Sequence, residues 1–458
     1  MFKERIERWL RQEPLRWAVI EYLCTLSCPL YLVGGAVRDA LLGRPGCDVD
    51  LAVKGRAIAL ARQIADRFHG AYVPLDLERD TARVVFVLEG RRQYVDLAKL
   101  RAESIEEDLQ ARDFTVNAMA VPLLEGGVGE LIDPTGGQRD LSRRLLRVVY
   151  PQAFAEDPLR VLRAVRLQGS LGFVLTDDTM ELARRWAWAL SKVSAERIRD
   201  ELVQILSLRE ASEAFQCAFE LGALRVVFPE LASSELAADA IATLRELEKV
   251  LAGFEEGGGP FPQLRPYRGA LLMHWNDEFS PGQKGRLLLK LAALLVPVFW
   301  NEPRGAARVA RRLRFSSQQV CYLERILQGV RLLLEGSVLR EPLGAYRYFR
   351  QVGKAGLDGA ILFLVLQDQA RQKAHLDVVQ FLLEAWFRRY DRLVAPPRLL
   401  SGREVMEVLG LKPGPDVGKW LERLQEAQVK GQVRSREEAI VFLRRCKGGY
   451  VRKRDKRA

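Results

Sequence analysis

The stretch that decides the fold reads Tyr31-Leu32-Val33-Gly34-Gly35-Ala36-Val37-Arg38-Asp39-Ala40-Leu41-Leu42-Gly43, and Asp48-Val49-Asp50-Leu51-Ala52-Val53 follows it closely. An apolar run leads into two glycines, and apolar residues then recur at helical spacing, so we expect a strand, a tight turn and a helix. Glycines at a helix start let backbone N–H groups approach an anion. The pattern predicts a phosphate-binding turn at Gly34 and Gly35, with a plain structural turn as the alternative.

The second stretch carries two acidic residues, Asp48 and Asp50, on one predicted strand. Side chains at i and i+2 of a strand point to the same side, with α-carbons about 6.6 Å apart. Two such carboxylates repel each other unless a cation lies between them. Oxygen ligands suit Mg²⁺, and a pair of these ions activates an attacking hydroxyl and stabilises a leaving pyrophosphate. We therefore expect Asp48 and Asp50 to be catalytic, metal-binding residues, with a solvated turn as the alternative.

Together these residues resemble the signature of the bacterial tRNA nucleotidyltransferase and poly(A) polymerase family, the class II branch of the polymerase-beta-like superfamily. Three further motifs follow in the order of that family, at residues 111–120 (ARDFTVNAMA), 133–141 (DPTGGQRDL) and 156–166 (EDPLRVLRAVR). Four ordered motifs make the resemblance specific. A weaker similarity at residues 402–418 extends it over most of the chain.

The resemblance implies that several residues bind the nucleotide. Gly34, Gly35, Arg38 and Arg112 are expected to position the triphosphate, and Asp113 is expected to accept a hydrogen bond from the ribose 2′-hydroxyl. An ionised carboxylate suits this role because it only accepts hydrogen bonds. The alternative for Arg112 and Asp113 is a surface ion pair, worth about 0–1 kcal/mol. Asn117 resembles a supporting polar residue of the same motif.

In the fourth motif, Asp157 followed by Pro158 is typical of a helix N-cap with a first-turn proline, which places Asp157, Arg160 and Arg163 on adjacent parts of one helix face. Capping alone would explain Asp157. By resemblance, Asp157 and Arg160 instead read the incoming base, and Arg163 belongs to the same nucleotide-binding set. Cytosine and adenine both offer an amino donor beside a ring-nitrogen acceptor, whereas uracil and guanine present an oxygen acceptor and a ring N–H at the same places, so no nucleic-acid template is needed.

Two positions are left open. Asp96, on the predicted strand at residues 93–97, is a third carboxylate of the metal site, the partner of an arginine such as Arg101, or a residue that simply ends the strand. Residues 78–83 lie where the family has a mobile loop used in switching from C to A addition, and their polar sequence (ERDTAR) suits a loop. Residues 291–297 lack the His-Asp pair that some relatives use for phosphohydrolase activity, so that activity is not expected.

Composition favours a nucleic-acid partner. The 458 residues carry 71 Lys and Arg against 59 Asp and Glu, a net charge of +12 that favours polyanions. The longest apolar stretch, residues 287–300, is shorter than the ~20 residues a membrane helix needs, and no signal peptide is seen, so we expect a cytoplasmic protein without membrane contact. The six cysteines are scattered, which supports neither a zinc site nor a disulfide framework.

The expected fold class is α+β. Short β-rich runs at residues 30–33, 49–53, 71–75, 83–88 and 93–97 surround a helical segment at residues 57–68, and a turn at residues 125–129 joins strands at 119–124 and 130–133. From about residue 142 onward only helical spacing is found. We expect a nucleotidyltransferase head with a mixed sheet (1–145), followed by an elongated all-helical neck that selects the base (146–210), a body (211–320), a tRNA-binding tail (321–446) and a basic extension (447–458).

The resemblance therefore implies a CTP/ATP:tRNA nucleotidyltransferase that adds CCA to the tRNA 3′ end with Mg²⁺ as cofactor. Within the family, the motifs also fit an enzyme that adds only CC or only A, or a poly(A) polymerase. A scaffold that binds RNA through an inactive catalytic domain is the alternative from a different class, and the complete set of acidic and basic motif residues argues against it. The sequence does not specify the oligomeric state.

Overall fold

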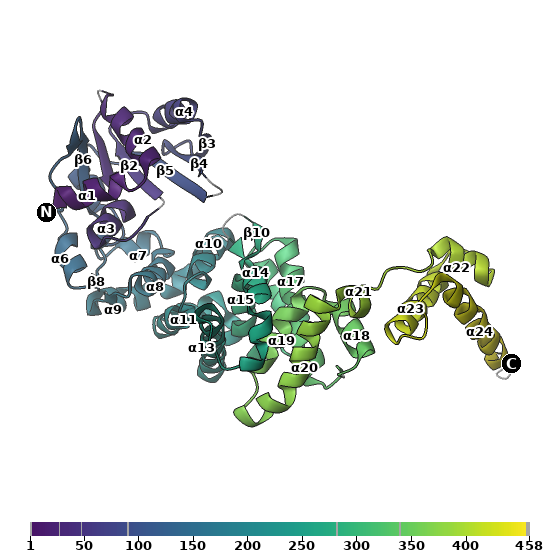
Figure 1. Cartoon of the computed structure of the whole chain (residues 1–458). Helices are drawn as coiled ribbons and strands as arrows, with labels where there is room; N and C mark the ends of the chain where they lie inside the picture. The colour runs from purple at the N-terminus through teal and green to yellow at the C-terminus, as the bar shows by residue number, and fades with distance from the viewer. Residues whose placement is uncertain are drawn as a thin grey trace. The chain divides into compact units, whose positions relative to one another are not determined.

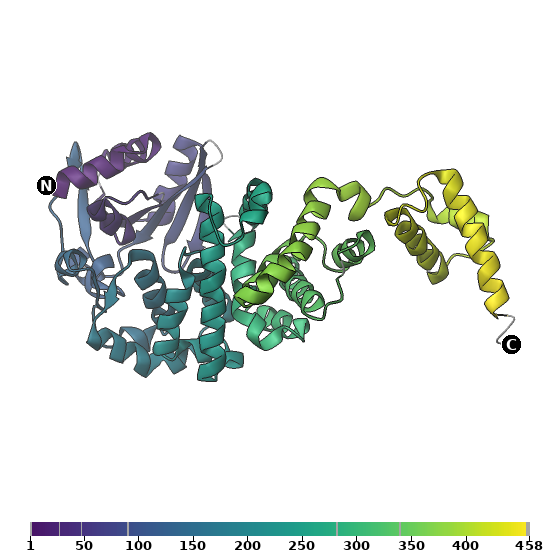
Figure 2. The same ribbon diagram turned by 60° about the horizontal axis from the view of Figure 1, so that its bottom comes forward.

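The structure is a computed structural model that describes residues 2–26, 28–46, 48–88, 91–280, 283–338 and 340–454. It divides into two compact units, one formed by Met1–Val193 with Cys217–Val227 and the other by Ser194–Gln216 with Phe228–Ala458. Figures 1 and 2 show the strands of the large sheet in the purple to blue N-terminal segment, and helices in the segments that follow. The predicted α+β class, a mixed-sheet head followed by helices, is confirmed. The finer division into neck, body, tail and extension stays a prediction, and residues 455–458 of the extension lie outside the described residues.

The first unit is built on a seven-stranded sheet with the order β3-β4-β5-β2-β1-β6-β7. β2 and β5 run parallel, and the other neighbouring strands run antiparallel. This places the strand with Asp48 and Asp50 in the middle of the sheet. The strands are β1 (Leu30–Val33), β2 (Asp48–Val53), β3 (Ala71–Asp76), β4 (Thr81–Leu88), β5 (Arg91–Lys99), β6 (Ala120–Leu124) and β7 (Gly127–Val128).

Helices of the first unit pack their apolar faces on this sheet and on one another. In α3, the residues Ala36, Val37, Ala40 and Leu41 are buried at helical spacing, and Gly43 ends the helix in the left-handed conformation. The helices are α1 (Phe2–Arg11), α2 (Pro14–Cys24), α3 (Gly35–Leu42), α4 (Ala57–Phe68), α5 (Ile105–Gln110), the 3-10 helix η1 (Thr115–Asn117), α6 (Gly137–Ser142), α7 (Ala153–Glu156), α8 (Arg160–Leu171), α9 (Asp177–Trp186), η2 (Ala187–Lys192) and α12 (Ala223–Val227); α11 (Ala211–Glu220) spans the boundary between the units.

Three local predictions were wrong. The turn after β6 is shorter than residues 125–129, because Leu123 pairs with Val128 and Leu124 with Gly127, and the second predicted strand contributes the isolated bridge from Ile132 to Ala120. Strands do recur after residue 142, as the short pairs β8 (Leu145–Leu146) with β9 (Val174–Leu175) and β10 (Glu278–Ser280) with β11 (Gln283–Lys284). Such two- and three-residue strands are too short to show a period in the sequence.

The third correction concerns the expected loop at residues 78–83. The chain turns at residues 77–80, whereas Thr81 already pairs with Asp76 and Arg83 with Val73 in the β3–β4 hairpin. The predicted loop is therefore a tight hairpin turn. Half of the segment is strand, because Thr81, Ala82 and Arg83 belong to the run of β4 in which partly exposed and buried residues alternate.

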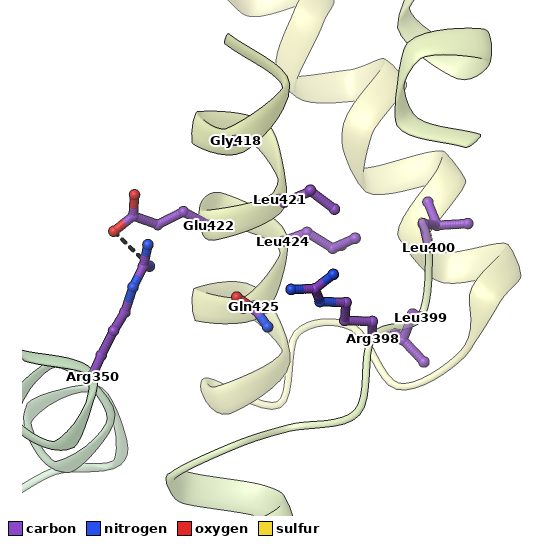
Figure 3. Close-up of a pocket in the computed structure, with 9 residues that line it drawn as sticks. All are labelled: Arg350, Arg398, Leu399, Leu400, Gly418, Leu421, Glu422, Leu424 and Gln425. Carbon is purple, nitrogen blue, oxygen red and sulfur yellow. Dashed lines mark ion pairs between the residues drawn. The ribbon is translucent and has the colours of Figure 1, made fainter. Parts of the chain in front are cut away.

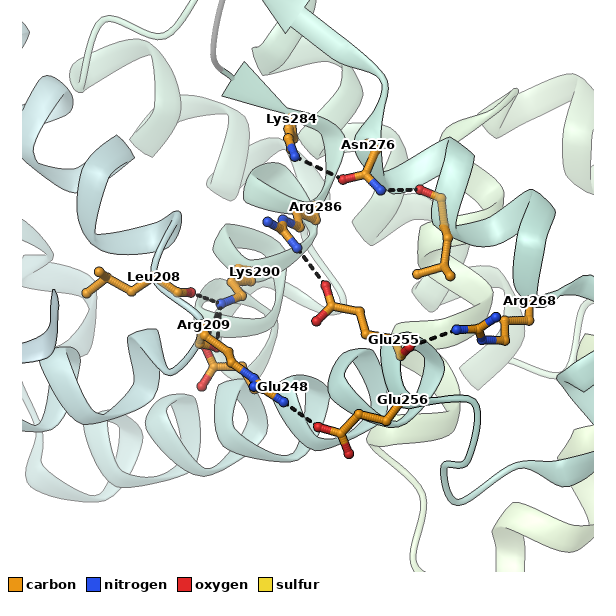
Figure 4. A network of polar contacts seen from close by, with 11 residues as sticks. Leu208, Arg209, Glu248, Glu255, Glu256, Arg268, Asn276, Lys284, Arg286 and Lys290 are labelled. Carbon is orange, nitrogen blue, oxygen red and sulfur yellow. Dashed lines mark hydrogen bonds and ion pairs between the residues drawn. The ribbon is translucent and has the colours of Figure 1, made fainter. Parts of the chain in front are cut away.

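The second unit is helical apart from the β10–β11 pair among the residues described. Its helices are α10 (Ala195–Leu206), the first part of α11, η3 (Pro229–Leu231), α13 (Ser234–Glu256), η4 (Pro262–Tyr267), α14 (Arg268–Asn276), α15 (Gly285–Phe299), α16 (Pro303–Arg312), α17 (Ser317–Leu334), α18 (Pro342–Val352), α19 (Ala355–Val365), α20 (Gln369–Arg388), α21 (Tyr390–Leu393), α22 (Gly402–Leu409), α23 (Pro415–Val429) and α24 (Arg436–Arg454). Figure 4 shows a polar network that joins α13, α15 and the segment after α10.

The last three helices have a hydrophobic core of their own. It is formed by ten buried residues that include Leu400, Val405, Trp420 and Leu443. Contacts between α18 and α23 are polar: Tyr346 donates to Gln425 at 3.0 Å, and Arg350 pairs with Glu422 at 2.6 Å. Figure 3 shows this ion pair beside a pocket of about 190 Å³ that none of the predicted site residues lines.

Two further observations bear on the sequence-based expectations. No helix in the described part of the chain is long and apolar enough to cross a membrane. Cys24, Cys28, Cys217, Cys321 and Cys446 are free thiols, and Cys47 lies outside the described residues.

Candidate active site

The glycine turn between β1 and α3 is closely covered by charged side chains. Gly34 has φ +68°, a conformation that other residues rarely adopt. A Cβ atom there would lie 3.1 Å from Arg112 Nη1 and 3.5 Å from Asp50 Oδ2, and a Cβ on Gly35 would lie 3.4 Å from Arg38 Nη2. The structure thus brings five of the predicted residues together: Gly34, Gly35, Arg38, Asp50 and Arg112.

Burial and the charges of neighbouring acidic residues raise the pKa values of both acidic residues on β2. Asp48 and Asp50 occupy the same face of the strand, and Asp50 pairs in register with Asp96 of the parallel strand β5. Burial raises the pKa of Asp50 to about 6, with the charges of Asp96 and Asp48 adding to the effect and Arg112 opposing it. Burial also raises the pKa of Asp48, against the charge of Arg83. A bound cation would relieve this repulsion.

Asp96 is the partner of an arginine, although not of Arg101. It accepts two hydrogen bonds from Arg83, from Nε and Nη2, each at 2.7 Å, and the two residues face each other in the β4–β5 register. The Arg83 guanidinium also lies 4.7 Å from the centre of the Tyr94 ring. Sequence reasoning missed Arg83, because cross-strand register is not visible in a single sequence.

The two carboxylates of β2 fit a divalent cation whose remaining coordination positions are filled by substrate and water. Within the residues the structure describes, no group of three or more His, Cys, Asp and Glu side chains is placed to hold a metal ion. Asp48 and Asp50 offer oxygen donors, and the two arginine hydrogen bonds to Asp96 occupy the third acid. Mg²⁺ is commonly bound by one or two carboxylates with waters and substrate phosphates, so this donor set fits it.

A chain of hydrogen bonds links the glycine-turn helix to α8. Arg38 contacts Asp39 through Nε at 2.9 Å and donates to the Asn117 side-chain oxygen at 2.5 Å. The Asn117 amide donates to Asp113 at 3.3 Å, and Arg163 on α8 pairs with Asp113 at 2.5 Å. The structure therefore joins Arg38, Asn117, Asp113 and Arg163, all predicted site residues, into one network.

Asp113 is the buried centre of that network. Its residue is 8% exposed, and its carboxylate also accepts the Phe114 backbone N–H at 2.8 Å. Burial opposes ionisation, but the charge of Arg163 and the hydrogen bonds from Phe114 and Asn117 outweigh it and lower the pKa of Asp113. Two donors bind Oδ1 and one binds Oδ2, so the carboxylate, which has about four acceptor sites, keeps about one for a ribose hydroxyl, and that role stays a prediction.

Arg112 is oriented by a residue that the sequence reasoning did not single out. Asp108 Oδ2 accepts from Arg112 Nη2 at 3.1 Å and Nε at 3.3 Å, and Asp108 Oδ1 accepts the Arg101 backbone N–H at 3.1 Å. Asp108 is 4% exposed. The spacing of four residues between Asp108 and Arg112 was the available signal, because residues four apart lie near each other at the end of a helix.

The start of α8 differs from the prediction. α8 begins at Arg160 and not directly after Asp157, which has extended backbone angles. The Asp157 carboxylate still accepts the Leu159 backbone N–H at 3.3 Å, so it caps the turn that leads into the helix. The backbone between Asp157 and the helix forms a tighter turn, in which the Arg160 N–H donates to the Asp157 carbonyl and the Val161 N–H to the Pro158 carbonyl, each at 3.0 Å.

Arg160 is held beside that turn by a tyrosine. Its Nη1 donates to Tyr150 Oη at 2.8 Å and to the Ala153 carbonyl at 3.1 Å, and its Nη2 reaches the Ala111 carbonyl at 3.5 Å. Tyr150 in turn donates to Glu156 at 2.5 Å. Among the residues described, Arg160 thus contacts the residue before Arg112 and not the glycine turn itself.

The third motif has a structural role that the sequence analysis left unassigned. Asp133 accepts the backbone N–H groups of Gly137 at 2.7 Å and Gln138 at 2.9 Å at the start of α6. Asp140 is buried and accepts from Thr115 at 2.8 Å and from Arg147 at 3.1 Å. These contacts fix η1, which carries Asn117, against α6.

Comparisons with known proteins agree with this arrangement. Residues 30–147 match the family described as "Poly A polymerase head domain". Residues 172–235 match the family described as "Probable RNA and SrmB- binding site of polymerase A", and residues 292–443 match the family described as "tRNA nucleotidyltransferase domain 2 putative".

Curated relatives cover nearly the whole chain. The chain is 36% identical to a CC-adding tRNA nucleotidyltransferase of Geobacter sulfurreducens, over 90% of this chain and 91% of the relative. It is 32% identical to a CC-adding enzyme of Synechocystis sp. (93% and 96% covered) and 33% identical to an A-adding enzyme of Deinococcus radiodurans (90% and 94% covered).

Solved structures show the same fold. A CCA-adding enzyme in complex with CTP matches with a TM-score of 0.66 at 23% identity, covering 95% of this chain and 96% of that one. The ordered motifs, the head built around the glycine turn and the near full-length relatives lead to one conclusion: the chain is a nucleotidyltransferase and belongs to the bacterial tRNA nucleotidyltransferase family that includes CC-adding and A-adding enzymes.

Proposed function

We propose that this enzyme adds two C residues from CTP to a tRNA 3′ end that lacks CCA, and then stops. The observation that carries the restriction to CC is the short turn between β3 and β4. It stands where the resemblance places the mobile loop used in switching from C to A addition.

That turn is fixed from both sides. Asp76 accepts the backbone N–H groups of Glu78 and Arg79, each at 3.0 Å. Asp80 accepts those of Ala57 and Ile58 at 3.1 and 2.9 Å, at the start of α4. A turn of four residues that is anchored to the start of α4 through Asp80 is too short to carry the movement of a longer loop. The CC-adding relatives from Geobacter and Synechocystis support the same restriction.

The chemistry proposed for the site is transfer of a nucleotidyl group to the primer hydroxyl. The backbone N–H groups after Gly34, together with Arg38 and Arg112, bind the triphosphate and place its α-phosphate for in-line attack. Asp48 and Asp50 would hold Mg²⁺, which when bound supplies charge neutralisation at the phosphates and activation of the attacking hydroxyl. Arg83 leaves Asp96 neutralised beside them.

Base selection is assigned to the turn before α8. Asp157 would accept from the exocyclic amino group of cytosine, and Arg160 would donate to its ring nitrogen. The contacts of Arg160 with Tyr150 and Ala153 hold the guanidinium in place before substrate arrives, so that little ordering is needed on binding.

The tRNA partner is supported by charge. Residues 398–454 carry 14 Lys and Arg against 7 Asp and Glu, so most of the net charge of the chain lies in its last eighth. An excess of this kind binds phosphates with a strong dependence on salt.

A nucleotide-by-nucleotide assay tests the proposal. The protein is incubated with Mg²⁺ and tRNA transcripts that end before CCA or after CC, with CTP or ATP offered alone, and the products are resolved at single-nucleotide resolution. We expect two C additions to the first transcript and no A addition to the second. Unrelated RNA of equal length serves as the control and should not be extended.

Full CCA addition is the second candidate, because the site would read adenine by the same two hydrogen bonds. Addition of two C residues to the first transcript together with addition of A to the transcript ending in CC would establish it and contradict the restriction proposed from the β3–β4 turn. Addition of A without any addition of C would instead indicate an A-adding enzyme. Addition of long A tails to unrelated RNA would instead point to a poly(A) polymerase.

Removal of the Arg160 guanidinium tests base selection. For Arg160→Gln, we expect kcat/KM for CTP to fall by about 10- to 100-fold, since a hydrogen bond to a charged group contributes about 1.5–3 kcal/mol. The kcat/KM for UTP should fall far less, so the ratio of kcat/KM for CTP to that for UTP decreases. Arg185→Gln, an equal charge change at an exposed position of α9, is the control. Equal losses with both nucleotides would contradict a base-reading role.

A further inference from the structure

We propose that the N-terminal helix pair, α1 and α2, positions the loop that leads from α3 into the strand of Asp48 and Asp50, and that Arg16 is the positioning residue. The inference rests on the proposed function of those two acids. The match to the head-domain family begins only at residue 30, so the helix pair lies outside it.

Arg16 is buried between the helix pair and the loop. The residue is 4% exposed, and its guanidinium lies 3.9 Å from the centre of the Trp9 ring. Its Nη1 donates to the Trp9 carbonyl at 2.8 Å, and its Nη2 donates to the carbonyl of Gly46, two residues before Asp48. One planar side chain thus joins α1 to the loop with two hydrogen bonds and a ring contact.

Trp9 makes the second set of contacts to the same loop. Its indole N–H donates to the Arg44 carbonyl at 2.9 Å. A Cβ atom on Gly46 would lie 2.7 Å from the Trp9 ring, which is closer than real Cβ contacts. The loop backbone therefore lies directly against the indole, and only glycine fits at position 46 without displacing it.

The loop is held from its other side by α8. Arg44 donates from Nη1 to the Ser170 carbonyl at 2.9 Å and from Nη2 to the Leu171 carbonyl at 3.1 Å. These carbonyls lie at the C-terminal end of the helix that begins with Arg160. A single loop is thus fixed to the helix pair on one side and to the base-selecting helix on the other.

Asp48 depends on such contacts because β1 does not reach it. The β1–β2 pairing ends at Leu51, so Asp48 and Asp50 are paired on the β5 side alone. Displacement of a reacting group by about 1 Å can lower a rate by about 10²-fold. Contacts at Arg44 and Gly46 therefore replace the missing strand as the support for this end of β2.

Substitutions on both sides of the contact test the proposal. For Arg16→Gln and for Gly46→Ala, we expect kcat for C addition, corrected for the folded fraction, to fall about 10- to 100-fold, with KM for CTP and for tRNA within twofold of the wild-type values. The control is Arg11→Gln, which removes an arginine stacked on Trp17 in the same helix pair and should leave both constants unchanged. Unchanged kcat in both test variants, or full activity of Arg16→Lys, would overturn the positioning role.

Hydrogen exchange separates this inference from the proposed function. Backbone exchange in a peptide covering residues 41–52 should accelerate in Arg16→Gln and Gly46→Ala and not in Arg11→Gln, whether or not the protein extends tRNA. If wild-type protein adds no nucleotide but exchange accelerates as expected, the proposed function fails and the positioning stands. If exchange in this peptide is unaltered, the positioning fails.

Discussion

Asp50→Asn is expected to abolish C addition, by at least about 10³-fold, while it makes the metal-free protein more stable. The loss follows if Asp50 is a ligand of the catalytic cation, because an amide cannot replace the charge of a carboxylate. The gain follows from the environment of the group. Burial, with the charges of Asp96 and Asp48, raises the pKa of Asp50 to about 6, so its ionised form is disfavoured in the folded protein.

The pH dependence of this effect has a definite sign. A carboxyl group whose pKa is higher in the folded than in the unfolded state takes up its proton more readily when folded, so it lowers stability as pH rises from about 4 to about 6. Above pH 6 the ionised Asp50 lowers the free energy of unfolding by its full amount, about 1–3 kcal/mol after allowance for partial exposure. The difference in unfolding midpoint between Asp50→Asn and wild type should be positive at pH 7.5 and should vanish near pH 4.

Thermal unfolding with and without Mg²⁺ measures both the stability gain of Asp50→Asn and its loss of Mg²⁺ binding. Added Mg²⁺ should raise the midpoint of the wild-type protein, which binds it, and should leave that of Asp50→Asn unchanged. Asp66→Asn, at an exposed position of α4 in the same unit, is the matched control and should behave as wild type. A fully active or a destabilised Asp50→Asn protein would contradict the placement of this acid in a metal site.

The sequence predicted the elements of the head correctly where neighbouring residues alone determine the structure. The strand at residues 30–33 and the helix at residues 57–68 coincide with β1 and α4, because apolar spacing and flanking glycines mark both within a few residues. Gly34, Asp50 and Arg112 were also brought to one place, but their proximity came from the resemblance to a family and not from spacing. Residues 79 apart, such as Arg38 and Asn117, give no sign in a single sequence that they touch.

The failures have a common physical cause, which is pairing between distant segments. Asp96 was left between a metal role and Arg101, yet its partner is Arg83, because the β4–β5 register places those two opposite each other. Thr81 to Arg83 were read as loop from their polarity, although alternation with buried neighbours makes them strand. The pairing of Asp113 with Arg163 likewise depends on how α8 packs and is not visible in the sequence, and the role of Asp113 at the ribose stays a prediction. A polar residue can be buried if it has a hydrogen-bond partner, so polarity in the sequence does not by itself predict exposure.

In the second unit, loss of the Lys290 side chain is expected to cause the largest loss of stability. Lys290 is 4% exposed, and its ammonium donates to Glu248 at 2.7 Å, to the Leu208 carbonyl at 2.5 Å and to the Arg209 carbonyl at 3.1 Å (Figure 4). All three of its hydrogens are used. Burial lowers the pKa of Lys290, and the neighbouring charge of Glu248 opposes that effect.

Lys290→Met should lower the free energy of unfolding of this unit by about 3–5 kcal/mol, because it leaves a buried carboxylate without its cation. Glu248 would retain only the backbone N–H groups of Ala211 and Ser212, at 2.7 and 3.2 Å. The double variant Lys290→Met/Glu248→Gln should lose less than the sum of the two single variants, since the stranded charge is gone. Urea unfolding followed by hydrogen exchange in α13 and α15 measures each value.

An exposed ion pair on α13, the helix that carries Glu248, shows whether burial or ion pairing causes the expected loss of stability in Lys290→Met. Lys249 and Glu246 form an ion pair of similar length, 2.6 Å, but their side chains are 63% and 56% exposed. Lys249→Met should therefore cost at most about 1 kcal/mol. Should the two lysine substitutions cost the same, the ion pair itself and not its desolvation would set the stability, and the buried network would not be what joins α13 to α15.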